Sequence, residues 1–424
     1  GKEYFKSDGT VPWWVTSVSI FATLLSPISF LSLAGNSYAG TWIMWFAQLG
    51  MLLAIPVTIK FFLPIYSKLD IDTAYHYLEL RFNSKGLRVL RAVMFIIYQI
   101  GRMSIIMYLP CMVLSSLMGV NVNILIIIMG VIAIIYSYTG GLKSVLWTDS
   151  IQGSVLLIGV TFAVIFLIAH IDGGMGAVMD SLTAGHKFLA PDEPIFNINI
   201  LKNSVFLMIV GAGFNTMGSY VSSQDIVQRF TTTTDTKKLN KMMLANGGLS
   251  IFIATAFYLI GTALYVFYQV QGNPLPPAAQ QDQIFASWIA FELPVGVTGL
   301  LLAAIYAAAQ STLSTGLNSV ASSWTLDIQG RLSRKQLSFE TQTKIGQYVS
   351  LIVGIFSIVV AMVLANGGVT SAYEWFNGFM GLVLGILIGS FILGAFTKVA
   401  NTFATTLAFI APPVVMVYIK YFVA

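Results

Sequence analysis

About eleven apolar stretches recur along this chain, and each is long enough to cross a lipid bilayer as a helix. The hydrocarbon core of a bilayer is about 30 Å thick and takes roughly 20 helical residues to cross. The strict alternation of apolar and polar residues that a membrane β-barrel requires does not occur in these stretches. They lie near residues 12–34, 41–66, 87–118, 122–138, 145–170, 201–223, 241–269, 295–324, 342–365, 372–396 and 402–421. The sequence therefore predicts an all-α polytopic membrane protein.

The composition leaves no room for a water-soluble alternative. Of the 424 residues, 56% are hydrophobic and only 9% are charged, whereas soluble domains carry about 25% charged residues. The pI near 9.1 does not indicate nucleic-acid binding, because the basic residues are scattered between apolar stretches.

The distribution of Lys and Arg predicts the orientation. If the segment before the first stretch is cytoplasmic, eighteen of the 22 basic residues, Arg229 among them, fall in cytoplasmic loops or adjoining helix ends. Only three would lie outside. A missed span would invert every later loop, so the bias supports the span count together with a positive-inside orientation.

Several kinds of protein are excluded by the motifs the chain lacks. The single cysteine, Cys111, rules out an internal disulfide and a Cys-rich metal site. The sequence has no Gly-rich phosphate-binding loop for ATP and no motif of a hydrolase or metalloprotease. We therefore expect no enzymatic activity. The chain does not begin with Met, so we expect its natural start to lie upstream.

We expect only two ionisable residues, Arg102 and Asp149, to lie inside the helix bundle, where a charge is costly and indicates a functional site by default. Arg102 is about fifteen residues from either end of its helix, too deep to reach an interface. A guanidinium that faces a cavity would bind a substrate carboxylate through two hydrogen bonds. A structural ion pair is the alternative, although we expect no acid at that depth except Asp149. For Asp149, the alternatives are a cation ligand and an interfacial helix cap.

Proline interrupts the first stretch. Pro27 removes a backbone hydrogen bond and frees carbonyl groups upstream of it, and Ser26 and Ser29 lie beside the break. A simple proline kink is the alternative. Residues 211–218 (GAGFNTMG) predict a second interruption in the sixth stretch.

Two broken helices five spans apart are typical of the inverted repeats of ion-coupled transporters. We therefore expect one transporter domain over residues 1–424, with repeats at about 12–170 and 201–396 and an extra helix at 402–421.

A stripe of hydroxyl groups marks the eighth stretch. Ala308, Ser311, Thr312 and Thr315 follow helical spacing and share one face, and Ser314 lies beside it. Packing between helices is one explanation of such a stripe. Oxygen ligands for a monovalent cation are the other.

These residues together resemble the sodium/solute symporter family. The resemblance covers essentially the whole chain and rests on residues 13–14 (WW), 138–152 (YTGGLKSVLWTDSIQ), 307–319 (AAAQSTLSTGLNS) and 394–401 (GAFTKVAN). It implies the leucine-transporter fold, a 5+5 inverted helical repeat, and sodium-coupled symport by alternating access. Members usually carry a further helix before the first core helix, and this chain begins in the loop that follows it.

The resemblance also implies the coupling ion, Na⁺, and two sites for it. The common site would use backbone oxygens of Ala22, Leu25 and Ala308 with the hydroxyls of Ser311 and Thr312. The second site would comprise Asp149, Ser311, Ser314 and Thr315.

Within the family, the resemblance is strongest to the bacterial sodium/sialic acid symporters. It implies that Arg102 holds the substrate carboxylate, that Ser26, Ser29 and Gln48 complete the site, and that Phe214 belongs to the inner gate. The implied partners are sialic acid, sodium ions and the lipid bilayer of the bacterial inner (cytoplasmic) membrane. Neither nucleic acid nor an obligate protein partner is implied.

Other functions stay open from the sequence. The chain could transport another small carboxylate or sugar with sodium, for example proline, or it could be a channel or a non-transporting sensor. Arg102 disfavours a neutral sugar, and broken helices around a small polar site favour stoichiometric coupling.

Overall fold

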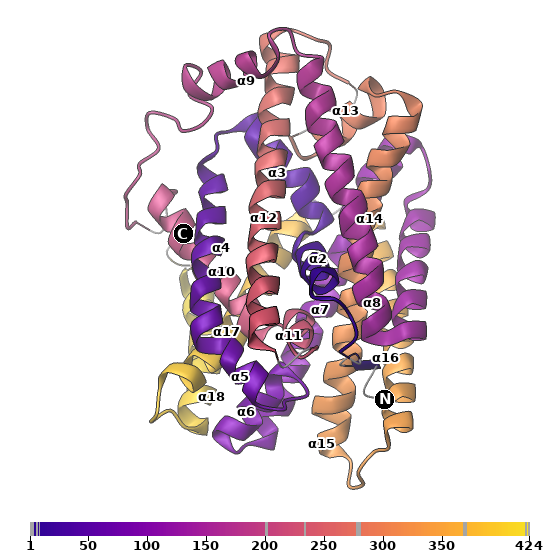
Figure 1. Cartoon of the computed structure of the whole chain (residues 1–424), viewed down its shortest axis with the longest axis vertical. Helices are drawn as coiled ribbons and strands as arrows, with labels where there is room; N and C mark the ends of the chain where they lie inside the picture. The colour runs from indigo at the N-terminus through magenta and orange to yellow at the C-terminus, as the bar shows by residue number, and fades with distance from the viewer. Residues whose placement is uncertain are drawn as a thin grey trace.

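The molecule is a bundle of helices that run mostly along its long axis (Figure 1). The computed structural model describes residues 4–5, 7, 9–199, 202–232, 235–276, 281–367, 371–419 and 422, and the regular elements in these ranges are all helical. In chain order they are α2 (Trp13–Leu24), α3 (Pro27–Ala39), η1 (Ile43–Phe46), α4 (Ala47–Val57), η2 (Thr58–Phe62), α5 (Leu63–Lys68), α6 (Ala74–Phe82), α7 (Lys85–Met118), α8 (Val122–Ala169), α9 (Gly174–Thr183), α10 (Val205–Ser222), α11 (Gln224–Phe230), α12 (Thr236–Tyr265), η3 (Val266–Val270), η4 (Gln281–Gln283), α13 (Ile284–Glu292), α14 (Val295–Ser322), η5 (Ser323–Gln329), α15 (Gly330–Leu332), α16 (Phe339–Asn366), α17 (Ser371–Phe396) and α18 (Thr402–Tyr418).

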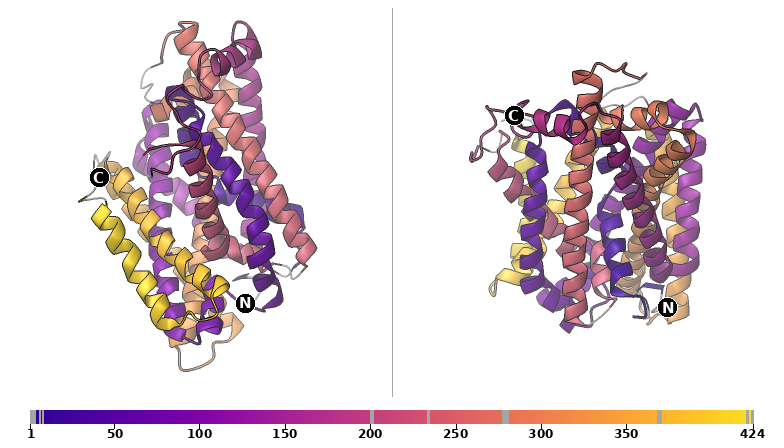
Figure 2. Two further views of the ribbon diagram at one scale, coloured as in Figure 1. Left: turned by 90° about the vertical axis from the view of Figure 1, so that its left-hand side faces the viewer. Right: turned by 45° about the horizontal axis from the view of Figure 1, so that its top comes forward.

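Seven helices in the described part of the chain are long and apolar enough to span a membrane, and the bent pair α2–α3 makes an eighth span. Gly385–Phe396 and Thr402–Tyr418 are shorter apolar helices, and the left-hand view of Figure 2 shows α17 and α18 side by side at one edge. The outer face of α8 exposes Ile151, Ile158 and Ile165 by 62%, 63% and 64%. These residues are seven apart, so they form one apolar stripe suited to lipid.

α8 contains two of the predicted spans. Its 48 residues would extend about 72 Å as a straight helix, far more than one bilayer crossing needs. The helix is bent at Gly141, whose φ of 57° and ψ of −150° are not helical. A Cβ at this position would lie 2.6 Å from the carbonyl oxygen of Tyr4, so the bend requires glycine. The loop predicted between the two spans is therefore a tight kink.

The break predicted in the first span is confirmed. α2 ends at Leu24, Leu25 and Ser26 are extended, and α3 begins at Pro27 with its axis turned by 62°. Ser26 is the N-cap of α3, and its hydroxyl accepts a hydrogen bond from the N–H of Ser29 at 3.2 Å.

The interruption predicted at residues 211–218 is wrong. α10 is continuous through these residues, and the chain breaks later, at the extended residue Ser223. The glycines serve close packing instead: a Cβ on Gly50 of α4 would lie 2.0 Å from the carbonyl oxygen of Ile209 and 2.8 Å from the nitrogen of Gly213. The second half of the broken span is α11.

Basic residues mark one end of the bundle. α5, α6 and α15 lie at one end of the bundle, and α9 and α13 lie at the opposite end (Figure 1). The first end contains Lys60, Lys68, Arg81 and Arg331, which the sequence predicts to be cytoplasmic.

Candidate functional site

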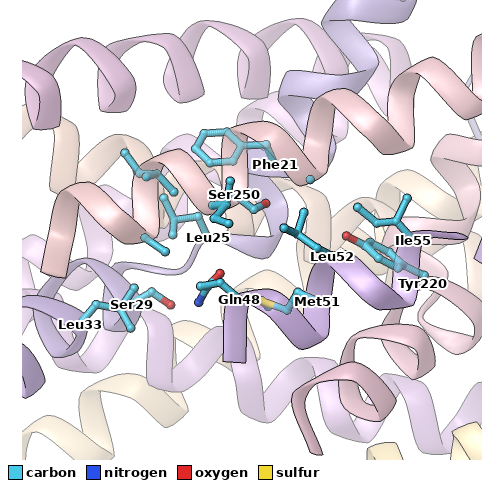
Figure 3. A pocket seen from close by; sticks show the side chains of 14 residues that line it. Phe21, Leu25, Ser29, Leu33, Gln48, Met51, Leu52, Ile55, Tyr220 and Ser250 are labelled. Atoms are coloured by element: carbon cyan, nitrogen blue, oxygen red, sulfur yellow. The ribbon is translucent and has the colours of Figure 1, made fainter. Parts of the chain in front are cut away.

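A cavity of about 240 Å³ lies beside the break between α2 and α3. Its wall is formed by α2 and α3, on either side of the break, together with α4, α10 and α12. Four polar side chains interrupt a largely apolar lining, namely Ser29, Gln48, Tyr220 and Ser250. The hydroxyl of Ser29 and the amide of Gln48 point toward the same space (Figure 3). The cavity is somewhat smaller than typical ligand pockets of about 300–1,000 Å³, so it suits a small molecule.

Two of the predicted substrate residues, Ser29 and Gln48, line this cavity, as does Leu25 of the predicted common sodium site. Ser26 and Arg102 are not among the lining residues, but the hydroxyl of Ser26 lies 3.3 Å from that of Ser29. Phe214 lies elsewhere: its side chain is 62% exposed and lines an apolar groove between α4 and α10.

Arg102 lies on α7, and its guanidinium is held on two sides. Nη1 donates to Oδ2 of Asp225 at 2.8 Å, and Nη2 donates to the carbonyl oxygen of Thr23 at 3.1 Å. Thr23 precedes Pro27 by four residues, and proline has no N–H to donate, so the helix break leaves this carbonyl for Arg102. The expectation that Asp149 is the one acid at the depth of Arg102 is therefore wrong, because Asp225 binds the guanidinium.

The expectation that Arg102 and Asp149 are the only ionisable groups within the bundle is also wrong. Asp225 and Arg229 on α11 are 1% and 0% exposed. The sequence pattern predicts a cytoplasmic Arg229, because this residue follows the sixth apolar stretch. The available signal was the i, i+4 spacing of the two charges around the apolar Ile226 and Val227, which is typical of a packed helical turn.

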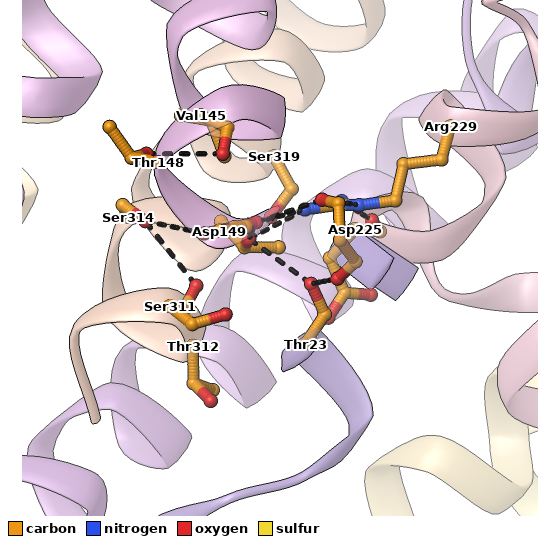
Figure 4. A network of polar contacts seen from close by, with 12 residues as sticks. Thr23, Val145, Thr148, Asp149, Asp225, Arg229, Ser311, Thr312, Ser314 and Ser319 are labelled. Atoms are coloured by element: carbon orange, nitrogen blue, oxygen red, sulfur yellow. Dashed lines mark hydrogen bonds and ion pairs between the residues drawn. The ribbon is translucent and has the colours of Figure 1, made fainter. Parts of the chain in front are cut away.

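Asp149 is the centre of a network of polar contacts (Figure 4). Its Oδ1 accepts a hydrogen bond from Ser314 at 3.2 Å, and its Oδ2 accepts from Thr315 at 2.8 Å and from Ser19 at 3.0 Å. The guanidinium of Arg229 also binds Oδ2, at 2.8 Å through Nη2. Asp149 is fully buried inside α8, which excludes the interfacial cap. The structure thus brings together three of the residues predicted for the second sodium site.

The residues predicted for the common sodium site lie on two elements that contact each other. Ala22 and Leu25 are at the end of α2 and in the break, and the other three are on α14. The hydroxyls of Thr23 and Thr315 link these elements at 3.2 Å. On α14, the hydroxyl of Thr312 donates to the carbonyl of Ala308 at 3.1 Å.

Ser311 provides a separate observation that fits a cation. Its hydroxyl oxygen is buried and has no hydrogen-bond partner in the structure. A buried polar group without a partner costs free energy unless a ligand binds it. The oxygen-only donor set of this face, formed by hydroxyls and helix-break carbonyls, is the type that transporters of this build use for sodium.

An all-α membrane protein with two broken helices and a small cavity beside one of the breaks is built as an ion-coupled secondary transporter. The chain belongs to the sodium:solute symporter family, because the sequence profile of that family matches residues 4–408. The predictions of this family and of sodium as the coupling ion are thereby confirmed.

Among its relatives, the sodium/sialic acid symporter SiaT of Proteus mirabilis (strain HI4320) is 33% identical over 419 residues, which are 99% of this chain and 84% of the relative. The sodium/sialic acid symporter NanT of Aliivibrio fischeri (strain ATCC 700601 / ES114) is 29% identical over 99% of this chain and 82% of its own. The sodium/glucose cotransporter of Vibrio parahaemolyticus is 26% identical over 99% of this chain and 79% of its own.

Solved structures give the same assignment. A substrate-bound, outward-open Na⁺-coupled sialic acid symporter is similar with a TM-score of 0.92 and 33% identity, over 99% of this chain and 86% of that one. The nucleobase-cation symporter Mhp1 has a TM-score of 0.62 and 15% identity, over 92% of this chain and 80% of that one. The second likeness concerns the fold alone. Together they confirm the leucine-transporter fold and its 5+5 inverted repeat.

Proposed function

We propose that this protein is a sodium-coupled symporter that imports sialic acid by alternating access. The observation that carries the proposal is the identity of 33% and 29%, over 99% of the chain, with two bacterial proteins named sodium/sialic acid symporters. The site is compatible with an anionic, hydroxyl-rich substrate, since it combines a cavity that has four polar side chains in its lining with a largely buried guanidinium beside the helix break.

In this proposal, Arg102 binds the substrate carboxylate through charge-assisted hydrogen bonds. Ser26, Ser29 and Gln48 bind its hydroxyl or amide groups from the cavity wall. The role of Phe214 in the inner gate stays a prediction with little support, because its exposed side chain lies in a separate groove.

Two sodium ions would be carried with each substrate. The common site would be formed by Ala22, Leu25, Ala308, Ser311 and Thr312. The second would be formed by Asp149, Ser311, Ser314 and Thr315, of which Ser314 and Thr315 already hydrogen-bond the Asp149 carboxylate.

The energetics favour two ions for a scavenger of a dilute anion. A tenfold sodium gradient supplies about 1.4 kcal/mol per ion, and a potential of about 100 mV adds about 2.3 kcal/mol per charge. An anion that moves inward loses about 2.3 kcal/mol to the same potential. One sodium ion therefore leaves about 1.4 kcal/mol, or about tenfold accumulation. Two leave about 5 kcal/mol, or several thousandfold.

We further propose that the protein resides in the bacterial inner membrane with the α5–α6 end in the cytoplasm. The repeats would comprise residues 12–170 and 201–396 of a single transporter domain, and α18 would be the extra C-terminal helix. The clustering of basic residues at that end supports the orientation.

Uptake into proteoliposomes tests the proposal. With an inward sodium gradient, labelled N-acetylneuraminate should accumulate above its outside concentration, and replacement of sodium by potassium should abolish this. Liposomes without protein are the control. If unlabelled proline, lactate or glucose blocks or replaces this uptake while N-acetylneuraminate does not accumulate, the substrate is another carboxylate or a sugar. Currents without accumulation would instead indicate a channel.

A further inference from the structure

The second proposed sodium site already contains a positive charge supplied by the protein. The guanidinium of Arg229 binds the Asp149 carboxylate at 2.8 Å and the hydroxyl of Thr315 at 2.6 Å through Nη2. Its Nε donates to the hydroxyl of Ser19 at 3.0 Å. Arg229 therefore engages the acid and one hydroxyl of the site proposed for sodium (Figure 4).

A second ion pair lies within reach of the first. Asp225 binds Arg102 through Oδ2 at 2.8 Å and is four residues before Arg229 on α11. Side chains at this spacing are neighbours on a helix surface. Nη1 of Arg229 already donates to the backbone carbonyl of Asp225. The other carboxylate oxygen of Asp225, Oδ1, is buried and has no hydrogen-bond partner.

Sodium and the Arg229 guanidinium compete for Asp149 for an electrostatic reason. With both cations on one carboxylate, a full positive charge would be buried without compensation, and burial of an unpaired charge is strongly unfavourable. When sodium binds Asp149, Arg229 must therefore find another anion. The nearest buried carboxylate on its own helix is that of Asp225.

We propose that sodium at Asp149 transfers the Arg229 guanidinium to Asp225, which in turn releases Arg102 for the substrate carboxylate. Before the exchange the pairs are Arg229 with Asp149 and Arg102 with Asp225. After it they are sodium with Asp149, Arg229 with Asp225, and Arg102 with the substrate. Each buried positive charge has one negative partner in both arrangements.

This exchange, which rests on the proposed function, makes Asp225 and Arg229 positioning residues for substrate binding. It explains how a guanidinium that is bound by an internal acid becomes available to a substrate. Because the coupling is thermodynamic, it is reciprocal: the substrate raises the affinity for the second sodium ion by the same factor. The required movement is a change of side-chain conformation on α11.

The test is the sodium dependence of N-acetylneuraminate binding to the purified full chain, with potassium replacing sodium at constant ionic strength. Each sodium ion linked to binding contributes one power of its concentration, so a tenfold rise in unsaturating sodium should raise the wild-type affinity about a hundredfold. In Asp225→Asn, Arg102 has no anionic partner in the protein. The rise should fall to about tenfold, and affinity at low sodium should increase.

Arg229→Gln should lower both the sodium dependence of N-acetylneuraminate binding and the affinity at low sodium. Its sodium dependence should also fall to about tenfold per decade, because Arg229 no longer links the sites. The affinity of this variant for N-acetylneuraminate at low sodium should decrease, since Asp225 has no other guanidinium to bind and stays paired with Arg102. Asp327→Asn is the matched control, because Asp327 forms a fully buried pair with Arg88 away from the site and should retain the hundredfold dependence. An unchanged hundredfold dependence in Asp225→Asn would overturn the exchange.

A readout without substrate separates this inference from the proposed function. The sodium concentration that half-stabilises the protein against heat should be at least about tenfold lower in Arg229→Gln than in the wild type, because the competing guanidinium is gone. A wild type that binds no sialic acid would reject the proposed substrate, and the sodium shift would still decide the competition. An equal sodium midpoint in both proteins would contradict it.

Discussion

In the described part of the chain, two clusters of arginine–aspartate pairs stand out, one at the α5–α6 end of the bundle and one at the centre. At the α5–α6 end, the guanidinium of Arg88 binds two carboxylates, those of Asp327 and Glu79, and the hydroxyl of Thr73 also binds Asp327. These contacts join α6, α7 and η5. At the centre, two guanidiniums and two carboxylates form the successive pairs Arg102–Asp225 and Arg229–Asp149.

Burial does not distinguish the two clusters, and both leave one carboxylate oxygen without a partner, Oδ2 of Asp327 and Oδ1 of Asp225. The difference lies in the neighbours. The guanidinium of Arg88 contacts two carboxylates, so it stays in place even if one of these contacts is lost. Asp225 has a second guanidinium, that of Arg229, on its own helical turn. The network also lies next to both helix breaks, the one at Leu25–Ser26 and the one at Ser223. The first arrangement fixes the packing of α6, α7 and η5, whereas the second contains the alternative partner that the proposed exchange requires.

Removal of Arg102 should have the largest effect on the central cluster. Loss of one partner of a buried charged contact costs about 2–5 kcal/mol, so we expect Arg102→Ala to weaken sialic acid binding by up to about a thousandfold. Calorimetry at high sodium measures this. Arg91→Ala is the control, because Arg91 is another buried arginine on α7 and contacts the carbonyl of Thr405. Near-normal affinity in Arg102→Ala would remove Arg102 from the substrate site.

Asp149→Asn should reduce the coupling from two sodium ions to one. Under a tenfold gradient and about 100 mV, the limit of accumulation then falls from several thousandfold to about tenfold. The ratio of labelled sodium to labelled substrate, measured in proteoliposomes, should change from two to one. If the ratio stays the same in this variant, Asp149 is no ligand of a coupled ion.

Asp327→Asn should affect stability more than transport. Breaking a buried pair typically costs about 3–5 kcal/mol, and the remaining contact of Arg88 with Glu79 places the expected cost at the lower end. The melting temperature of the purified protein should fall by several degrees, while the sodium-to-substrate ratio stays at two. A changed ratio would mean that the cluster at the α5–α6 end also takes part in coupling.

Gln48→Ala should have the smallest effect. A single hydrogen bond contributes about 0.5–1.5 kcal/mol net, so the affinity for sialic acid should fall by about threefold to tenfold with unchanged sodium dependence. Leu53→Ala is a suitable control, because Leu53 lies on the same helix and is 63% exposed on the other side. Equal affinity in both variants would exclude Gln48 from the substrate contacts.

The features that could be predicted from the sequence are those with local causes. The length of each apolar stretch predicts the spans, and Pro27 predicts the break because a missing N–H acts on its own helix. The position of the second break could not be predicted, since glycines such as Gly213 favour both a break and close packing. Only the approach of α4 within van der Waals distance distinguishes them.

The charges of α11 were missed for a tertiary reason. A sequence pattern shows that Asp225 and Arg229 are neighbours, but whether they are solvated or buried depends on partners that are 80 or more residues away. The hydroxyl face of α14 could be recognised from spacing. Its role opposite Asp149 came only from the resemblance, because the contact joins helices that are distant in sequence.

The most direct measurement is a structure of this protein determined with sodium and N-acetylneuraminate bound. The account predicts that sodium lies on Asp149, that the Arg229 guanidinium contacts the Asp225 carboxylate, and that Arg102 contacts the carboxylate of the bound sugar acid. A complex in which the sugar acid is seated while Arg102 stays on Asp225 and Arg229 on Asp149 would contradict it.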